Sequence, residues 1–305
     1  MGRTAFLILA HHRPEQLARL VDRLRSPMSD IFIHVDRKAA APPFHAVVDG
    51  ARFLPDARRV AVHWGGFSMV RATFELIRFA LAEAPEAERF VLLSGAHYPT
   101  RPVREILAAL AGDAEHIRID RVLDPEGEGW FDRCANRLYL GDNALLNPRT
   151  GRYRPSQLAR RLEALAPRRR HGLAVHYGPQ WWALTRPTLE EALAAVEAQP
   201  RRLASFRFAR TPDEMVFQTL LKASSHAERI VQDATTGPEA WHPALAGVTY
   251  VAFDALDADE PRILTLADLP DIRASGALFA RKMDPDVSAP LMDALDAGSE
   301  AARAA

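Results

Sequence analysis

The stretch "TAFLILAHHRPEQLARLVDRLRSPMSDIFIHVD" (residues 4–36) contains three elements of a fold in order. "TAFLILA" (4–10) is a continuous apolar run that predicts a buried strand, and "DIFIHVD" (30–36) predicts a second strand. Between them, residues 14–26 repeat apolar side chains at helical spacing behind a proline that suits a first helical turn. A strand, a helix and a strand in this order predict a β-α-β unit with parallel strands.

The same alternation continues through the first half of the chain. Residues 58–64 predict a third strand, 67–84 a long helix and 89–95 a fourth strand. This order predicts an α/β fold with a doubly wound, mostly parallel central sheet. Further along, strand-like segments are predicted at 117–123, 177–186 and 248–254, and helices at 155–171, at 187–199 and from 211 onward.

Polar or glycine-rich segments follow all four predicted strands. They are His11-His12, then His34, Asp36 and Lys38, then Trp64, Gly65 and Gly66, then Ser94, Gly95, His97 and Tyr98. Because the carboxyl ends of parallel strands meet at one edge of a sheet, these segments favour a ligand site there over four ordinary loops.

The composition limits the classes of protein and of partner. A chain of 305 residues can bury a substantial core, and no convincing linker divides it. We therefore expect one catalytic-sized domain over 1–290 and an Ala-rich tail, 291–305, that is partly frayed. Lys plus Arg equals Asp plus Glu, 39 each, so no global charge favours nucleic acid or a membrane surface.

Cysteine usage and the first residues give an expectation for the compartment. Cys134 is the single cysteine, which excludes an intramolecular disulfide and favours a reducing cytoplasm. The first apolar run is too short to span a membrane and lacks the features of a signal peptide. We expect a soluble cytoplasmic protein with no transmembrane segment.

Several well-known motifs are missing. No G-x-G-x-x-G follows the first strand, and no P-loop, H-E-x-x-H or G-x-S-x-G motif occurs. Asp-x-Asp occurs only late, at 257–259 and 284–286, and not after a central strand where a sugar-nucleotide enzyme would hold a divalent metal. Ser94 leaves an α/β hydrolase as an alternative, although no nucleophile elbow surrounds it.

The segment "RTPDEMVFQTLL" (210–221) allows two interpretations. In the first, Thr211 caps a helix, Pro212 occupies its first turn and Glu214 completes a capping box. In the second, Glu214 is a carboxylate held at a helix start and facing a cleft, as a general base requires. The two are compatible, and the residues alone leave both open.

Seven segments together carry a family resemblance, from about residue 4 to 286. They are "LILAHHRPEQLARLVDRL", "IFIHVDRK", "VHWGGFSMVRATFELIRFAL", "FVLLSGAHYPTRP", "QWWALTR", "TPDEMVFQTLL" and "SGALFARKMD". In this order they resemble the core-2/I-branching β-1,6-N-acetylglucosaminyltransferases, a family that also contains peptide O-xylosyltransferases, in a soluble bacterial-type form. The resemblance implies a GT-A-like nucleotide-diphospho-sugar transferase fold, an inverting mechanism and no metal or other cofactor. The implied partners are a UDP-sugar donor and a glycan, glycolipid or protein acceptor.

The resemblance also implies the reacting groups. Glu214 is expected to be the catalytic base for the acceptor hydroxyl, with Asp213 as its neighbour at the helix start. The helix start is expected to lower the pKa of Glu214. Lys282, flanked by Arg281, is expected to neutralise the leaving diphosphate in place of a metal.

The remaining implied positions bind the donor or the acceptor. Asp36 is expected to form a hydrogen bond with the base or ribose of the donor, beside His11 and His12. The donor is expected to lie against Trp64, Gly65 and Gly66. Its sugar is expected to be bordered by Ser94, Gly95, His97 and Tyr98. Trp181 and Trp182 are adjacent and face opposite sides of a strand, so one is expected in the core and the other against a sugar ring.

One position departs from the family pattern. Where the family has a strand Arg, this chain has Thr249 or a neighbouring residue, and Arg262 or Arg281 is the candidate substitute. The alternative function is therefore an impaired family member that binds a nucleotide sugar or glycan without transfer.

Overall fold

Strand β1 (Arg3–Ala10) lies at the centre of the main sheet, between β2 (Ser29–Val35) and β4 (Ala87–Ser94). It pairs in parallel with both, and its side chains from Thr4 to Ala10 are buried. A parallel strand covered on both faces has no solvent-facing side, which explains its continuous apolar sequence. The structure is a computed structural model that describes residues 2–149, 157–238, 241–254 and 260–304.

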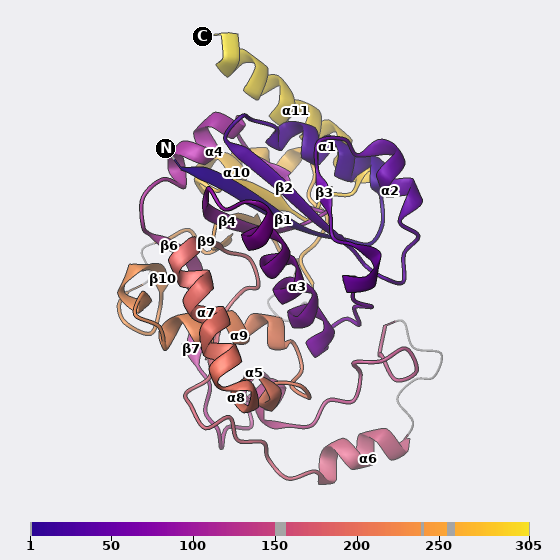
Figure 1. The fold of residues 1–305 in the computed structure, drawn as a ribbon, viewed down its shortest axis with the longest axis vertical. Helices are drawn as coiled ribbons and strands as arrows, with labels where there is room; N and C mark the ends of the chain where they lie inside the picture. Colours follow the sequence, from indigo (N-terminus) through magenta and orange to yellow (C-terminus); the bar gives the residue numbers. More distant parts are fainter. Residues whose placement is uncertain (1, 150–156, 239–240, 255–259, 305) are drawn as a thin grey trace.

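The sheet extends from this centre in both directions. Next to β2 lies β3 (Arg52–Phe53), in parallel; beyond β4, the strand β9 (Ala183–Thr185) runs antiparallel to both its neighbours, β4 and β6 (Glu115–Ile119). The edge strand β10 (Ile230–Asp233) is parallel to β6. Within the described residues the order is β10-β6-β9-β4-β1-β2-β3 (Figure 1), which confirms the predicted α/β fold with a mostly parallel central sheet.

Helices cover both faces of this sheet. On one face α1 (Pro14–Leu24) packs with Phe6 and Ile8 of β1, and on the other α3 (Phe67–Glu83) packs with Ala5 and Leu7. Alternate side chains of a strand point to opposite faces, so the single apolar run of β1 supplies both cores.

Shorter elements complete the chain. The other helices are α2 (Pro42–Val47), α4 (Val103–Ala109), α5 (Trp130–Asn136), α6 (Gln157–Leu165), α7 (Arg186–Ala198), α8 (Pro200–Ser205), α9 (Val216–Lys222), α10 (Leu269–Ala274) and α11 (Pro285–Ala304), with 3-10 turns η1 (Asp56–Arg58), η2 (Pro212–Glu214), η3 (Ala227–Arg229) and η4 (Leu266–Asp268). A second sheet has the order β11 (Leu245–Ala246), β12 (Thr249–Val251), β13 (Phe279–Arg281) and β5 (Tyr98–Pro99), and β7 (Arg121–Val122) pairs with β8 (His176–Tyr177). No helix in the described ranges combines the length and apolar character needed to cross a bilayer.

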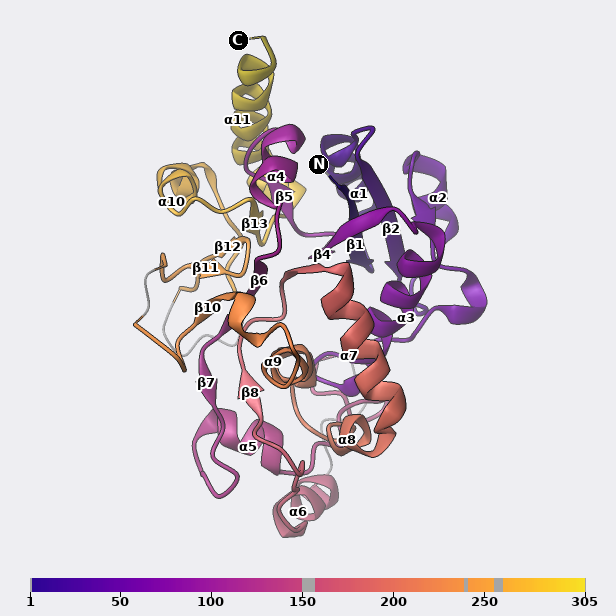
Figure 2. The same ribbon diagram turned by 60° about the vertical axis from the view of Figure 1, so that its left-hand side comes forward.

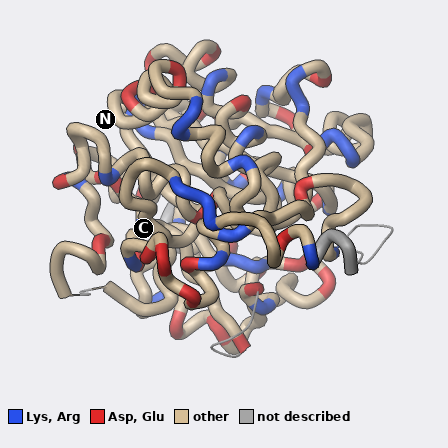
Figure 3. Tube along the Cα trace, turned by 90° about the horizontal axis from the view of Figure 1, so that it is seen from below, with Lys and Arg blue, Asp and Glu red and all other residues tan. Residues whose placement is uncertain are grey.

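The charged residues are spread over the molecule. Lys and Arg alternate with Asp and Glu along much of the trace (Figure 3). This distribution agrees with the equal numbers of the two kinds of residue in the sequence.

Residues 58–64 do not form the predicted third strand. The Val60 amide donates to Nε2 of His34 at 2.9 Å, and the Val60 carbonyl accepts the Arg37 amide at 3.0 Å. The backbone of Val60 is thus satisfied by a side chain and a loop rather than by a neighbouring strand. The strand that pairs in parallel with β2 is instead β3, which lies earlier in the chain than residues 58–64.

Helix α11 occupies most of the range in which we expected a frayed tail. Figure 2 shows it at the end of the molecule opposite α6. Arg19 of α1 pairs with Asp293 at 2.6 Å and Asp296 at 2.7 Å, and the Tyr98 hydroxyl donates to Asp296 at 2.8 Å. Leu295 is buried in the same contact. These bonds fix α11 against the first helix of the chain.

A buried carboxylate of β6 holds the antiparallel strand β9 in the central sheet. Glu115 is fully buried, and its oxygens accept hydrogen bonds from the Thr185 amide at 2.9 Å, the Thr185 hydroxyl at 2.5 Å and the Thr188 hydroxyl at 2.6 Å. The Arg89 guanidinium lies 3.8 Å away. A charge in this position needs all of these partners to offset the loss of water.

We expect Glu115→Ala to lower the free energy of unfolding by about 3–5 kcal/mol, because Arg89 is left as an uncompensated buried charge. Urea unfolding followed by circular dichroism measures the change. The exposed Glu86→Ala is the control and should stay within about 0.5 kcal/mol of the parent. Equal effects of the two substitutions would contradict the role given to Glu115.

Candidate active site

The carboxyl edge of the central sheet brings together one group of predicted site residues. The Asp36 amide donates to the Ala10 carbonyl at 2.8 Å, which extends the β1–β2 pairing past the strand ends. The Asp36 carboxylate is buried and bonds the amide and the ammonium group of Lys38 at 2.8 and 2.9 Å. Asp36, Lys38 and Lys282 all act electrostatically on His11. The first and second strands therefore meet the late Lys282 here.

A second group surrounds Glu214. Its Oε2 accepts a hydrogen bond from the Tyr177 hydroxyl at 2.6 Å. Arg281, at the end of β13, acts electrostatically on both Glu214 and Asp213, and its guanidinium carbon lies 4.5 Å from the Trp181 ring centroid. Because Arg281 and Lys282 are adjacent, this group and the group at the sheet edge are two ends of one region.

Burial controls the charge of the two adjacent carboxylates. It raises the pKa of Glu214 more than the hydrogen bonds from Tyr177 and Thr211 lower it, and Arg281 lowers it less. Burial and the nearby Glu214 raise the pKa of Asp213. The expectation that a helix start lowers the pKa of Glu214 is wrong, because η2 is a single three-residue turn and desolvation is the larger effect. A raised pKa makes the ionised Glu214 a stronger base.

The capping-box interpretation of the same segment is also wrong. Thr211 has a left-handed backbone with φ of 50° and makes no side-chain cap, while Glu214 points to Tyr177. A β-branched residue in this region costs on the order of 1–3 kcal/mol and needs strong surroundings. Here the Thr211 amide donates to the Gly65 carbonyl at 2.9 Å, and the Thr211 carbonyl accepts the Glu214 amide at 3.0 Å. The strained turn thus sets the direction of the Glu214 side chain.

Trp64 and the two glycines after it contact the segment that follows α5. A side chain at Gly66 would overlap the Asp142 carboxylate, which accepts the Ser68 amide at 3.0 Å at the start of α3. Gly65 has φ of 70°, which favours glycine. The guanidinium carbon of Arg149 lies 3.4 Å from the Trp64 ring centroid. The face of Trp64 is therefore covered by a cation.

The residues that follow β4 make contacts with different parts of the molecule. Gly95 bonds Leu9 of β1 through its amide at 2.9 Å, and Tyr98 is directed to Asp296 rather than to Glu214. His97 is fully buried, and its Nδ1 accepts the Ser94 amide at 2.9 Å. Burial holds the pKa of His97 well below its usual range.

The Ser94 hydroxyl also lies 2.9 Å from Nδ1 of His97, as a nucleophile and base would. A hydrolytic triad needs a third group to orient the base. Within the part of the chain that the structure describes, Nε2 of His97 has no hydrogen-bond partner. A hydrolase that used Ser94 as its nucleophile and His97 as its base would thus lack the carboxylate that orients the base.

The two adjacent tryptophans separate as a strand requires. Trp182 is fully buried against Phe217, with ring centroids 5.3 Å apart. Trp181 faces the other way, towards Arg281 and His97, with its ring centroid 4.4 Å from that of His97. Trp181 is buried as well, so protein groups contact the ring that we expected to meet a sugar.

The cations near the end of the chain have different partners. Nζ of Lys282 lies 2.6 Å from the Glu260 carboxylate, whereas Arg262 is held by Asp268. Thr249 is buried in β12, beside Phe279 of β13. Burial lowers the pKa of Arg281 to about 10, so this group stays charged at neutral pH.

Three residues that the sequence analysis did not select complete this region: Tyr177, Arg149 and Glu260. Tyr177 directly precedes the "GPQWW" stretch, and that position was a usable signal. Arg149 and Glu260 lie in irregular segments far apart in the sequence, and no spacing relates them.

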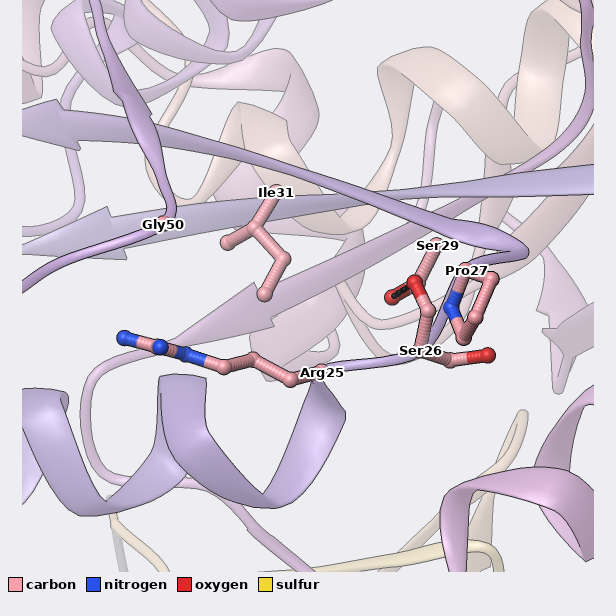
Figure 4. A pocket seen from close by; sticks show the side chains of 6 residues that line it. All are labelled: Arg25, Ser26, Pro27, Ser29, Ile31 and Gly50. Carbon is pink, nitrogen blue, oxygen red and sulfur yellow. Dashed lines mark hydrogen bonds between the residues drawn. The ribbon is translucent and has the colours of Figure 1, made fainter.

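Two surface hollows lie away from these groups. One, of about 340 Å³, is at the amino end of β2, and Figure 4 shows the side chains around it; its lining is Arg25, Ser26, Pro27, Ser29, Ile31 and Gly50. The other, of about 420 Å³, lies beside α3. Among the described residues, no group of three or more His, Cys, Asp or Glu side chains could hold a metal ion.

Comparison with known proteins gives two matches. A family model described as "Branch: Core-2/I-Branching enzyme" matches residues 4–269. The curated N-acetyllactosaminide beta-1,6-N-acetylglucosaminyl-transferase of Mus musculus is 25% identical over 223 residues, which cover 71% of this chain and 52% of that protein. The chain spans about half the length of this relative. The family match includes Glu214 and ends before Arg281 and Lys282.

The raised pKa of Asp213 predicts a pH-dependent stability. The folded state binds this proton more tightly than the unfolded state, so its contribution is present below the unfolded pKa and is lost as pH rises through the folded pKa. Asp213→Asn should therefore raise the free energy of unfolding by about 1–3 kcal/mol at pH 9 and change it little near pH 4.

Urea unfolding at the two pH values measures the effect. Asp113→Asn, at a side chain that is 79% exposed, is the control. A gain for Asp213→Asn that is no larger at pH 9 than at pH 4 would show that burial does not shift this group.

Proposed function

The chain belongs to the core-2/I-branching enzyme family, and we propose that it is an inverting glycosyltransferase using a UDP-sugar donor. The transferred sugar is N-acetylglucosamine or xylose, and the acceptor is a hydroxyl of a glycan, a glycolipid or a protein. The observation that carries the proposal is the half-buried Glu214, oriented by Tyr177 and placed beside Arg281. The printed activity of the mouse relative favours N-acetylglucosamine.

In the proposed reaction Glu214 accepts the proton of the acceptor hydroxyl. The oxygen of that hydroxyl forms a bond to the anomeric carbon on the face opposite the nucleotide. The bond from the anomeric carbon to the diphosphate breaks, and UDP leaves with its electron pair. One displacement inverts the configuration, so an α-linked donor gives a β-linked product. The proton then passes from Glu214 to solvent.

Desolvation supports the choice of base. A carboxylate whose pKa is raised by burial is a stronger base once it is ionised. The Tyr177 hydroxyl, whose own pKa is raised by burial and by Glu214, remains protonated and can only donate to the base. Tyr177 is thus a positioning residue for Glu214.

Positive groups support the binding of the leaving group. A departing diphosphate needs its developing charge stabilised. Lys282 acts electrostatically on His11, and the adjacent Arg281 acts on Glu214. We propose that protein cations take this role without a divalent metal, as the resemblance implies. The competing proposal, a family member that binds donor without transfer, follows from the missing Arg at Thr249.

The first experiment is a donor panel in the presence of EDTA. UDP release and thermal shift are measured with UDP-N-acetylglucosamine, UDP-xylose, UDP-glucose and UDP-galactose, with a set of glycan acceptors. We expect one donor to stabilise the protein and to release UDP. Glu214→Gln should lower that release at least about 100-fold and keep the thermal shift, since it removes the base and not the donor site.

Glu86→Gln, an exposed carboxylate away from the site, is the matched control. Donor binding without release by the parent protein, with every acceptor in the set, would favour the binding-only alternative. Release that requires added Mg²⁺ or Mn²⁺ would overturn the metal-free mechanism.

Tyr177→Phe should shift the acidic limb of the pH–rate profile. The lost hydrogen bond stabilised the ionised Glu214, so the pKa of the base rises and the limb of kcat/KM moves up by about one pH unit. Activity on the acidic limb falls and recovers at higher pH. Tyr250→Phe is the control, and a loss of rate that is equal at every pH would mean that Tyr177 is merely structural.

A further inference from the structure

Three cations lie close together at the junction of the two residue groups. Arg281 is balanced by Asp213 and Glu214. Lys282 and Arg149 instead share one carboxylate, that of Glu260: Lys282 binds Oε2 at 2.6 Å and Arg149 contacts Oε1. One negative charge thus bridges two positive ones.

The Glu260 carboxylate lies where two groups of residues meet: the group around His11 and Asp36, expected to bind the donor, and the group around Glu214, the proposed base. Lys282 acts electrostatically on His11, and Arg281, the next residue along the backbone from Lys282, acts on Glu214. The side chains of Lys282, Arg149 and Glu260 are 32%, 31% and 37% exposed. All three side chains are therefore partly accessible to a ligand from solvent.

Arg149 is held in place by more than its ion pair. Its guanidinium stacks on Trp64 at 3.4 Å from the ring centroid. The carbonyl of Trp64 accepts hydrogen bonds from Tyr139 and Asn147, each at 3.0 Å. A planar guanidinium fixed on an aromatic face is prepared to bind two oxygens of an anion side by side.

The two cations that contact Glu260 match the charge and the number of oxygens of a diphosphate. Burial and the nearby charges of Arg281 and Arg149 lower the pKa of Lys282. A diphosphate diester carries two negative charges, one for each of Lys282 and Arg149, and has more oxygens than a carboxylate. Arg262 is unsuited to this role because it pairs with Asp268.

We propose that Arg149 and Lys282 together bind the diphosphate of the donor, and that Glu260 occupies this place as an internal counter-ion until the donor replaces it. The inference rests on the proposed UDP-sugar donor and assigns the second cation that the strand position Thr249 lacks. The carboxylate holds the two cations at the spacing that an anion requires, and its displacement lowers the net affinity for the donor.

The test compares UDP with uridine by isothermal titration calorimetry. Arg149→Gln and Lys282→Gln should each weaken UDP binding by about 10–100-fold, the loss of one charge-assisted contact. Glu260→Gln should tighten UDP binding by about 3–10-fold, because the competing charge is removed while both cations remain. Uridine has no phosphate, and its affinity should be the same in all these variants.

Arg207→Gln, at an exposed arginine on the Phe208 ring, is the matched control. Circular dichroism and thermal unfolding confirm that each variant folds, and Glu260→Gln tests the idea without removing a cation. UDP binding that Lys282→Gln weakens but Arg149→Gln and Glu260→Gln leave unchanged would overturn this inference and keep the proposed donor. Failure of the parent protein to bind either UDP or uridine would overturn both.

Discussion

The parallel pairing of β1 with β2 and β4 is the constraint on which the rest of the molecule depends. Residue Leu9 lies opposite His34 on one side and Ser94 on the other, so all three strands end at the same level. The amides of Asp36 and Gly95 then bond the end of β1. This register places the following loops at one edge, and the late strand β13 brings Arg281 and Lys282 to the same region.

Within that frame, the chemistry depends on desolvation. Asp213, Glu214 and Arg281 are charged or chargeable groups partly removed from water. Glu214 and Arg281 shift the pKa of Asp213, Arg281 shifts that of Glu214, and both carboxylates shift that of Arg281. Burial raises the pKa of both acids, while the guanidinium limits the rise. The same low-dielectric surroundings strengthen the hydrogen bond from Tyr177 to Glu214. A base placed on an exposed loop would have neither property.

Local patterns in the sequence predicted what local forces decide. The apolar run of β1, the helical spacing of α1 and the second strand β2 follow from burial and periodicity, and the central sheet followed from their order. Glu214 was selected through its motif, and the structure places it beside Tyr177 and Arg281. Trp181 and Trp182 lie directly before β9, and they point in opposite directions as neighbouring residues of an extended chain do.

Contacts between distant segments were beyond such patterns. Residues 58–64 look like a strand, but the backbone of Val60 bonds His34 instead. The capping box failed because Thr211 adopts a left-handed backbone, which is held by its hydrogen bonds with Gly65 and Glu214. The pKa of Glu214 was predicted in the wrong direction because burial cannot be read from a helix start. Arg149 and Glu260 meet through tertiary structure alone.

The bonds between α1 and α11 also determine when the site can exist during synthesis. Lys282 lies just before α11, and the partners that hold this helix, Arg19 and Tyr98, are translated well before it. The central strands can pair while the later chain is still being made, but the cation next to Glu214 cannot arrive until β13 and α11 have docked. The central strands β1, β2 and β4 can therefore pair before Arg281 and Lys282 are in place, so that a nascent chain has the centre of its fold before it has a complete site.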